Sequence, residues 1–298
     1  MKKIVLFAAL FFTVGGVFAQ ALNFRPHWKV NETFSYYLFK NSYHPKDSAF
    51  GQDRDTVIAT FKVLEMSNKG YEVQLKLDYA KSLKPAFSPV GMQKVIADVK
   101  KKKALVIKLD TLGQYDSLKN WKEIKDECIK IINAEAKKDA NSAWPSLKSK
   151  FSTREQIEKY FSRELQFYFL LYGSVLRRSD MIEYEDVLEN PLNPSETFPA
   201  KVTLETKEKP GPVTVEVSFF MIPDLVAGKH QIEQIKDLVR KQEENPGALA
   251  DEDLFDMQDY YVYLHNTKTG THQNAIYVHY VKKGTKENVE SWKFMSID

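Results

Sequence analysis

The sequence predicts an α+β protein built on one antiparallel β-sheet with helices packed on one side. Three observations predict this class. Segments that alternate apolar and polar residues clearly outnumber segments with helical periodicity. The strand-like segments come in pairs joined by turns rich in glycine, asparagine and proline, which is typical of hairpins. The helical segments lie between groups of hairpins and do not alternate with single strands, which favours helices gathered beside an antiparallel sheet.

The N-terminus predicts export. Lys2-Lys3 precedes an apolar run at residues 4–12, and Val17-Phe18-Ala19 places small residues at the first and third positions before a cleavage site. This order is typical of a secretory signal peptide cleaved before Gln20, and cleavage before Leu22 fits as well. We therefore expect the mature protein in the periplasm or outside the cell.

The mature chain, residues 20–298, is expected to be a single β-rich domain with inserted helices. No stretch after the signal peptide (residues 1–19) approaches the ~20 apolar residues of a membrane span. The whole chain has 43 Lys and Arg against 40 Asp and Glu, and two of the lysines lie in the signal peptide. This near-neutral balance, without a basic cluster, argues against nucleic-acid binding.

The first half of the domain predicts two kinds of element. Residues 33–40 (TFSYYLFK) are strand-like, and residues 56–66 and 71–79 alternate apolar and polar side chains around a Ser-Asn-Lys-Gly turn, which predicts a hairpin. Residues 89–100 show helical spacing. The run Lys100–Lys103 then fits a solvated helix end, where cations complement the helix dipole.

The stretch Leu109–Ile124, LDTLGQYDSLKNWKEI, predicts a strand end, a tight turn, a short strand and a capped helix. Residues 104–110 are strand-like, and Gly113 provides the turn. Asn120 suits the N-cap position, and Glu123 stands where a capping-box acid would. A phosphate-binding loop would have several glycines and a Lys-Ser or Lys-Thr pair. We therefore interpret the stretch as structural.

The helix that begins near Trp121 carries Cys128, the only cysteine of the chain. Cys128 shares an apolar face with Ile124, Ile131 and Ile132. A single cysteine forms no internal disulfide, and a zinc–thiolate site normally needs several. We expect a buried, slowly reacting thiol and not a nucleophile.

A second helix is expected after Trp144, with Ser152 and Glu155 as its capping box and Gly173 at its C-terminal end. Its final turns are apolar nearly all round, so they must be covered on more than one side. Two interpretations stay open: deep packing under the sheet, or aromatic side chains that line a cavity for an apolar ligand. The residues predicted to line such a cavity are Tyr160, Phe167, Phe169 and Tyr172.

The C-terminal half predicts more antiparallel pairing. Residues 201–207 and 213–221 flank a Lys-Pro-Gly-Pro turn and form a hairpin. Asp224 could cap a helix that carries Ile232, Ile235, Leu238 and Val239. The chain then closes with strand-like segments that predict a meander, at residues 259–264, 275–281 and 288–297.

Histidines and acids near the C-terminus are the residues most suited to chemistry. His265, His272 and His279 are spaced by seven, and a turn near His272 would place His265 opposite His279. Two histidines alone make a poor zinc site, so we interpret them as ordinary strand residues. The acidic cluster at residues 251–259 lacks the glycine and terminal glutamate of a calcium loop, which favours a solvated loop.

Short catalytic and cofactor motifs are absent from the sequence. There is no Gly-x-Ser-x-Gly, no His-Glu-x-x-His and no Gly-x-Gly-x-x-Gly. We therefore expect no cofactor, no metal and no catalytic residue of a recognisable kind. Carboxylates are plentiful, so a hydrolase with an unrecognised carboxylate pair stays open.

The order of elements resembles a broad group of exported proteins of Gram-negative bacteria, of the Bacteroidetes type. The resemblance depends on the early Trp28, the strand TFSYYLFK, the hairpin that follows, the Asn120-Trp121 helix start, and the helix end FYFLLYG before ENPLNP. It implies the half-open, curved β-barrel of the lipoprotein carriers (LolA-like). The helices at Trp121 and Ser152 would then lie against the concave face. The resemblance implies no established activity and no site residue.

Three functions follow as hypotheses. The first is a non-catalytic protein of the cell envelope that binds an apolar ligand, such as a lipid or acyl chain. The second is a structural or interaction protein with a filled core, and the third is the hydrolase. An apolar cavity of ~300–1,000 Å³ would favour the first, and a solid core the second.

Overall fold

Most of the chain folds around one large antiparallel sheet. The computed structural model describes residues 21–43, 55–78, 91–138, 144–191, 196–209, 213–242 and 249–297. The predicted signal peptide lies outside the described residues. The sheet has 11 strands in the order β6-β5-β4-β3-β2-β13-β12-β11-β10-β9-β8. These strands are β2 (Thr33–Tyr43), β3 (Asp55–Ser67), β4 (Gly70–Asp78), β5 (Leu105–Leu109), β6 (Tyr115–Leu118), β8 (Met181–Glu189), β9 (Thr197–Glu208), β10 (Thr214–Pro223), β11 (Phe255–Asn266), β12 (Thr271–Lys283) and β13 (Lys286–Ser296).

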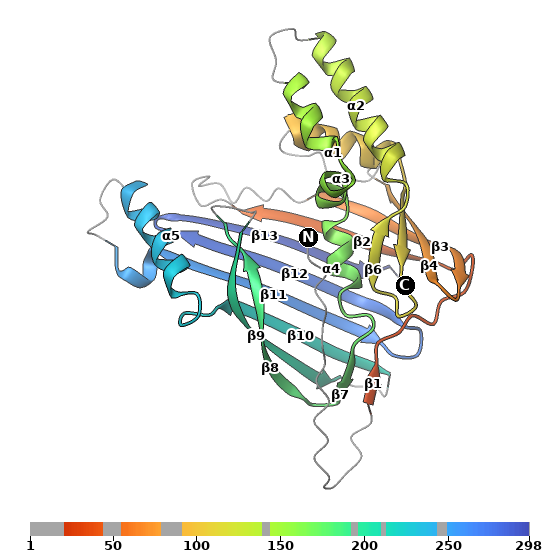
Figure 1. Ribbon diagram of the computed structural model, residues 1–298. Coiled ribbons are helices and arrows are strands. Elements are labelled where there is room, and N and C mark those ends of the chain that lie inside the picture. Colours follow the sequence, from red (N-terminus) through yellow and green to blue (C-terminus); the bar gives the residue numbers. More distant parts are fainter. Residues whose placement is uncertain are drawn as a thin grey trace, which may run out of the picture.

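The predicted α+β class with a large antiparallel sheet is confirmed. All neighbouring strands of the sheet pair antiparallel. The sheet is curved and does not close on itself, because β6 and β8 are its two edges (Figure 1). A separate small sheet pairs β1 (Ala21–Asn23) with β7 (Val175–Arg177).

The predicted hairpin is confirmed over the described residues 56–78, and its turn shows why a glycine is needed there. Gly70 begins β4 with a φ of 121°, a conformation that side chains rarely adopt. A Cβ atom at this position would lie 2.1 Å from the carbonyl oxygen of Leu109 on the neighbouring β5. The hairpin can therefore approach β5 only with glycine at position 70.

The helices are α1 (Gly91–Lys102), α2 (Trp121–Lys138), α3 (Arg154–Phe161), α4 (Arg163–Phe169) and α5 (Lys229–Gln242), with short 3-10 turns at Trp144–Phe151 (η1) and Asp251–Asp253 (η3). The helix expected from Ser152 is therefore two helices, α3 and α4, divided at Ser162. Its capping box is formed by Thr153 and Gln156, one residue beyond the expected pair. Asn120 occupies the predicted N-cap position, where its carbonyl accepts a hydrogen bond from the backbone N–H of Ile124. Its side-chain amide bonds the backbone of Ala104 and Val106.

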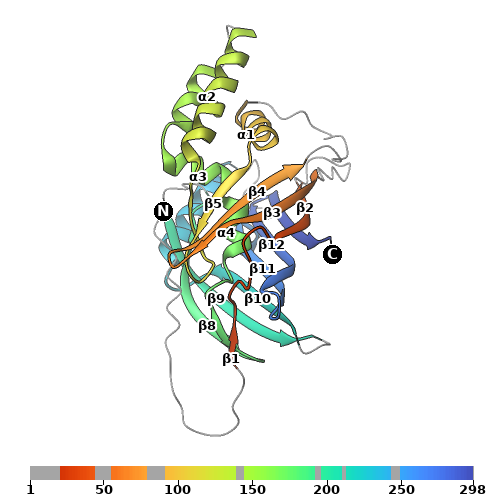
Figure 2. The ribbon, with the colours of Figure 1, turned by 90° about the vertical axis from the view of Figure 1, so that its right-hand side faces the viewer.

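The helices occupy different places relative to the sheet. The side chains of α4 pack on one face, which we call the inner face, where the Tyr168 ring stacks on Phe61 with centroids 4.9 Å apart. In contrast, α2 packs mainly against α1, η1 and α3, and this group stands off one end of the sheet (Figures 1 and 2). The position of α2 differs from the expected one because an apolar helix face specifies burial but not which partner supplies it.

At the basic C-terminal end of α1, the burial of the first lysine also differs from the expectation. Lys101 and Lys102 are exposed, as a solvated helix end requires, but Lys100 is buried, with 4% of its surface exposed. Its ammonium bonds both carboxylate oxygens of Glu164 on α4, at 2.9 and 3.1 Å. Glu164 is also paired with Lys40 of β2. This ion cluster joins α1, α4 and the sheet.

Candidate functional site

The inner face of the sheet carries two separate clusters of buried side chains. The larger cluster lies under α4, where the Phe167 carbonyl accepts a hydrogen bond of 2.8 Å from the Tyr263 phenol. The smaller lies under α5, whose Ile232, Ile235 and Val239 pack near Met257 of β11. Tyr263 and Met257 are six residues apart on one strand, about 20 Å at roughly 3.4 Å per residue. Two rows of inner-face residues fit between the clusters.

We call these two rows the central strip. Strand register places Tyr261 opposite Tyr277, and Tyr277 opposite Trp292, in the row nearer α4. In the row nearer α5, Asp259 lies opposite His279, and His279 opposite Glu290. Both rows continue onto β10, the first to Phe219 and the second to Met221. These residues all lie on the inner face, because every second residue of a strand faces the same side.

The row nearer α4 is aromatic. The ring centroids of Tyr261 and Tyr277 lie 4.8 Å apart, and those of Tyr277 and Trp292 lie 5.0 Å apart. Tyr277 is buried, whereas Tyr261 and Trp292 are half-buried. Burial raises the pKa of the Tyr277 phenol well above its ordinary value, against the lowering effect of Arg163. The row thus offers an apolar floor with neutral phenols.

The row nearer α5 is polar on β11 to β13. The Asp259 carboxylate lies 2.5 Å from Nδ1 of His279, with 11% and 16% of the two side chains exposed. Because this contact holds Nδ1, the other ring nitrogen, Nε2, is left for a further partner. The Tyr261 phenol oxygen lies 3.5 Å from the second carboxylate oxygen of Asp259.

Arg163, the first residue of α4, completes the strip. Its guanidinium carbon lies 5.0 Å from the centroid of the Trp292 ring, and one nitrogen lies 3.5 Å from the Glu290 carboxylate. Burial would lower the pKa of its guanidinium, but the electrostatic effects of Tyr277 and Glu290 outweigh burial and raise that pKa. In the sequence, the alternation of Tyr261, Tyr263 and His265 indicates that these side chains share one face of a strand. Nothing in the sequence indicates that Arg163 reaches this face from a helix.

The four residues predicted to line a ligand cavity lie in two places. Three of them are buried in the larger cluster: Phe167 and Phe169 of α4, and Tyr172, which follows that helix. Phe167 is the one that borders the central strip, with its ring 5.7 Å from that of Tyr277. Tyr160 lies apart on α3, 5.5 Å from the Phe151 ring. Ligand binding by these residues stays a prediction.

The histidines pair differently from the expectation. The turn lies at residues 267–270, so His265 faces His272, with their Nδ1 atoms 3.2 Å apart, and His279 faces Asp259. Burial lowers the pKa of His265 to about 3. Within the described residues, no group of three or more His, Cys, Asp and Glu side chains is arranged to hold a metal ion.

The acidic cluster and Cys128 have partners or surroundings that fit a structural role. In the acidic cluster, Asp251 pairs with Lys236 and Arg240, and Asp253 lies 2.5 Å from the Lys282 ammonium. Cys128 is fully buried, as expected, and burial raises the pKa of its thiol to about 12. Neither feature has the exposure or the arrangement of a reactive site.

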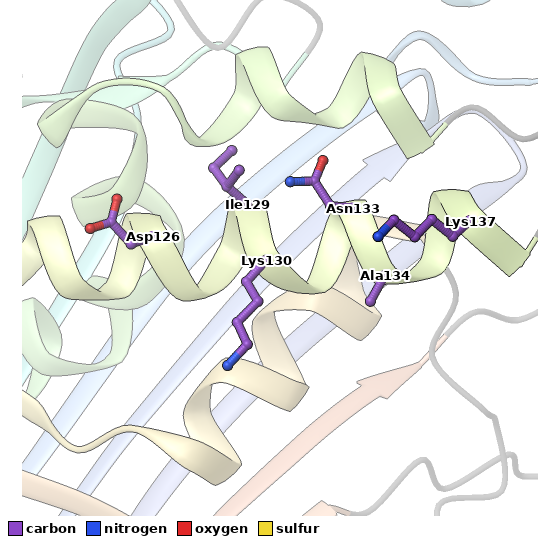
Figure 3. Close-up of a pocket in the computed structure, with 6 residues that line it drawn as sticks. All are labelled: Asp126, Ile129, Lys130, Asn133, Ala134 and Lys137. Atoms are coloured by element: carbon purple, nitrogen blue, oxygen red, sulfur yellow. The ribbon is translucent and has the colours of Figure 1, made fainter.

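A hollow of about 590 Å³ lies along the outer face of α2 (Figure 3). All of the residues that line it belong to this one helix, and all except Ile129 are exposed. The hollow is therefore an open part of the surface of one helix. It belongs to a different element from the central strip and lies far from it in the sequence. Its lining residues are Asp126, Ile129, Lys130, Asn133, Ala134 and Lys137.

Comparisons with known proteins give a distant likeness in shape. No family model matches the sequence, and no curated protein matches it. A solved structure concerning lipid–protein interactions in lipovitellin is similar over 89% of this chain and 25% of that chain, with 10% identity and a TM-score of 0.46. The chain thus spans about a quarter of that protein's length. Within the described residues, no helix is long and apolar enough to cross a membrane.

Proposed function

We propose that the protein binds an apolar or amphiphilic ligand, such as a lipid or acyl chain, on the central strip of the inner face. One observation carries the proposal: two helices cover the two ends of this face, and between them large apolar side chains stay half-buried. These side chains are Tyr184, Met221, Tyr261 and Trp292.

Half-buried apolar side chains on a concave face gain free energy when a ligand covers them. Covering about 200 Å² of apolar surface would contribute about 5 kcal/mol before the costs of binding. The open, curved sheet also supports the proposed likeness to the half-barrel of the lipoprotein carriers. Because the sequence predicts a signal peptide, we propose that this activity takes place in the cell envelope.

Adjacent residues on one strand provide a matched test. Tyr261 faces the strip, and Tyr260, its neighbour on β11, is 41% exposed on the outer face. We expect Tyr261→Ala to weaken binding of a fluorescent fatty acid at least about tenfold, equivalent to 1.4 kcal/mol, and Tyr260→Ala to leave it unchanged. Met221→Lys and Phe220→Lys form a second pair on β10, where Phe220 is 37% exposed.

Native mass spectrometry of protein purified from its host gives an independent readout. A co-purified lipid that is lost in Met221→Lys and kept in Phe220→Lys supports the proposal. If wild-type protein carries no lipid and binds no fatty acid, the proposal is wrong and the interpretation as a scaffold with a filled core takes its place. Circular dichroism of each variant checks that the fold is intact.

A further inference from the structure

Four ionisable groups meet at one end of an otherwise apolar strip. Asp259, His279 and Glu290 occupy facing positions on β11, β12 and β13, and Arg163 reaches the same place from α4. Polar groups at inner-face positions reduce stability unless they are paired. Here they give one end of the strip a polar character that the rest of the strip lacks.

Each carboxylate of this polar end already has a partner. Asp259 is held by His279 at 2.5 Å, and Glu290 lies 3.5 Å from Arg163. A phosphate or sulfate headgroup would meet the carboxylates of Asp259 and Glu290. A quaternary ammonium would meet Arg163, which already lies over the Trp292 ring where such a cation would pack. Either charged headgroup would therefore lie beside a group of like charge in a half-buried place.

Hydroxyl groups fit the same residues without such a cost. Carboxylate oxygens accept hydrogen bonds from hydroxyls, and guanidinium and imidazole nitrogens donate to them. The half-buried ring of Tyr261 provides a flat apolar surface for the C–H groups of a sugar ring. We infer that the polar end of the central strip holds an uncharged polyhydroxyl headgroup, such as a glycosyl group, of an amphiphilic ligand. This inference rests on the proposed function.

The strip also orients such a ligand. From His279 the row continues through Asp259 to Met221, Val202 and Tyr184 on β10, β9 and β8, where no charged side chain interrupts it. Four strand spacings of about 4.8 Å separate β12 from β8, roughly 19 Å in all. The headgroup would therefore lie over β11 to β13 and the apolar chain over β8 to β10.

A series of amphiphiles with one chain and different headgroups tests the inference on the wild-type protein. Octyl glucoside, octyl sulfate and octyltrimethylammonium are titrated below micelle formation by isothermal calorimetry, with circular dichroism to exclude unfolding. We expect octyl glucoside to bind at least tenfold more tightly than either charged amphiphile. Equal binding of all three, or tighter binding of a charged one, overturns the inference.

A matched pair of variants assigns the preference to the polar end. Asp259→Leu is expected to reduce octyl glucoside binding at least tenfold. Binding of the fluorescent fatty acid should stay the same or become tighter, because its carboxylate no longer meets Asp259. Asp256→Leu changes the outer face of the same strand and should alter neither. If the fatty acid binds but no glycosyl preference exists, the inference is wrong and the proposed function stands. If neither fatty acid nor glucoside binds, both are wrong.

Discussion

Replacing Glu164 by glutamine is expected to destabilise the fold strongly, because Glu164 is the carboxylate partner of two lysines at the junction of α1, α4 and the sheet. Lys100 is 4% exposed and Glu164 is 8% exposed, so water cannot replace the lost carboxylate. Burial alone would raise the pKa of Glu164, but the charges of Lys100 and Lys40 outweigh it and hold the pKa well below the usual range. The glutamine keeps the shape and removes only the charge.

The magnitude follows from the burial of the partner. Removing one member of a buried ion pair typically costs about 3–5 kcal/mol, because an uncompensated charge remains in the interior. For a domain of this size, 1 kcal/mol corresponds to roughly 2–4 °C in Tm, so we expect Tm to fall by roughly 6–20 °C. The double variant Lys100→Met/Glu164→Gln removes both charges and should recover most of this loss.

Urea and thermal unfolding, followed by circular dichroism at pH 7, measure these changes. The wild type, Glu164→Gln, Lys100→Met and the double variant form a complete cycle. A loss below about 1 kcal/mol in Glu164→Gln would place the site in the range of surface ion pairs and would refute the reasoning. A double variant no more stable than Glu164→Gln would show that the unpaired Lys100 charge does not cause the loss.

Further predictions concern the same core. Burial lowers the pKa of Lys100 from 10.5 to about 8, against the raising effect of Glu164. The unfolded chain therefore binds this proton more tightly, so the wild type should gain stability relative to Lys100→Met as the pH rises from about 8 to about 10.5. Cys128 should react with an alkylating reagent only after unfolding, and rapid stoichiometric labelling of native protein would contradict its burial. Cys128→Ala should cost about 1 kcal/mol, and Ile131→Ala, which leaves a larger cavity, about 2–5 kcal/mol, as measured by urea unfolding. Gly70→Ala should cost roughly 1–3 kcal/mol or more from backbone strain, because its Cβ would meet the Leu109 carbonyl. An unchanged Tm in that variant would contradict the hairpin geometry.

The sequence determined the elements wherever local periodicity or turn chemistry is strong. The β3–β4 hairpin, the β9–β10 hairpin and the β11–β13 meander follow from alternation and turn residues. The same reasoning did not find β8, where Glu183, Glu185 and Asp186 interrupt the apolar pattern. As an edge strand β8 buries little, so its sequence lacks the signal that burial imposes on central strands.

Tertiary structure decided which elements meet, and with them the candidate site. An apolar face predicts that a helix is buried, but it does not identify the element that covers it. The position of α2 beside α1 therefore could not be predicted from Ile124 or Cys128. The pairing of Asp259 with His279 depends on where the β11–β12 turn falls, because a different turn position changes every partner along the strands. Arg163 and Trp292 are far apart in the sequence and meet only because α4 lies across the folded sheet. Side-chain periodicity is a local property of the chain, whereas a site assembled from β11, β12, β13 and α4 depends on long-range packing that no local pattern encodes.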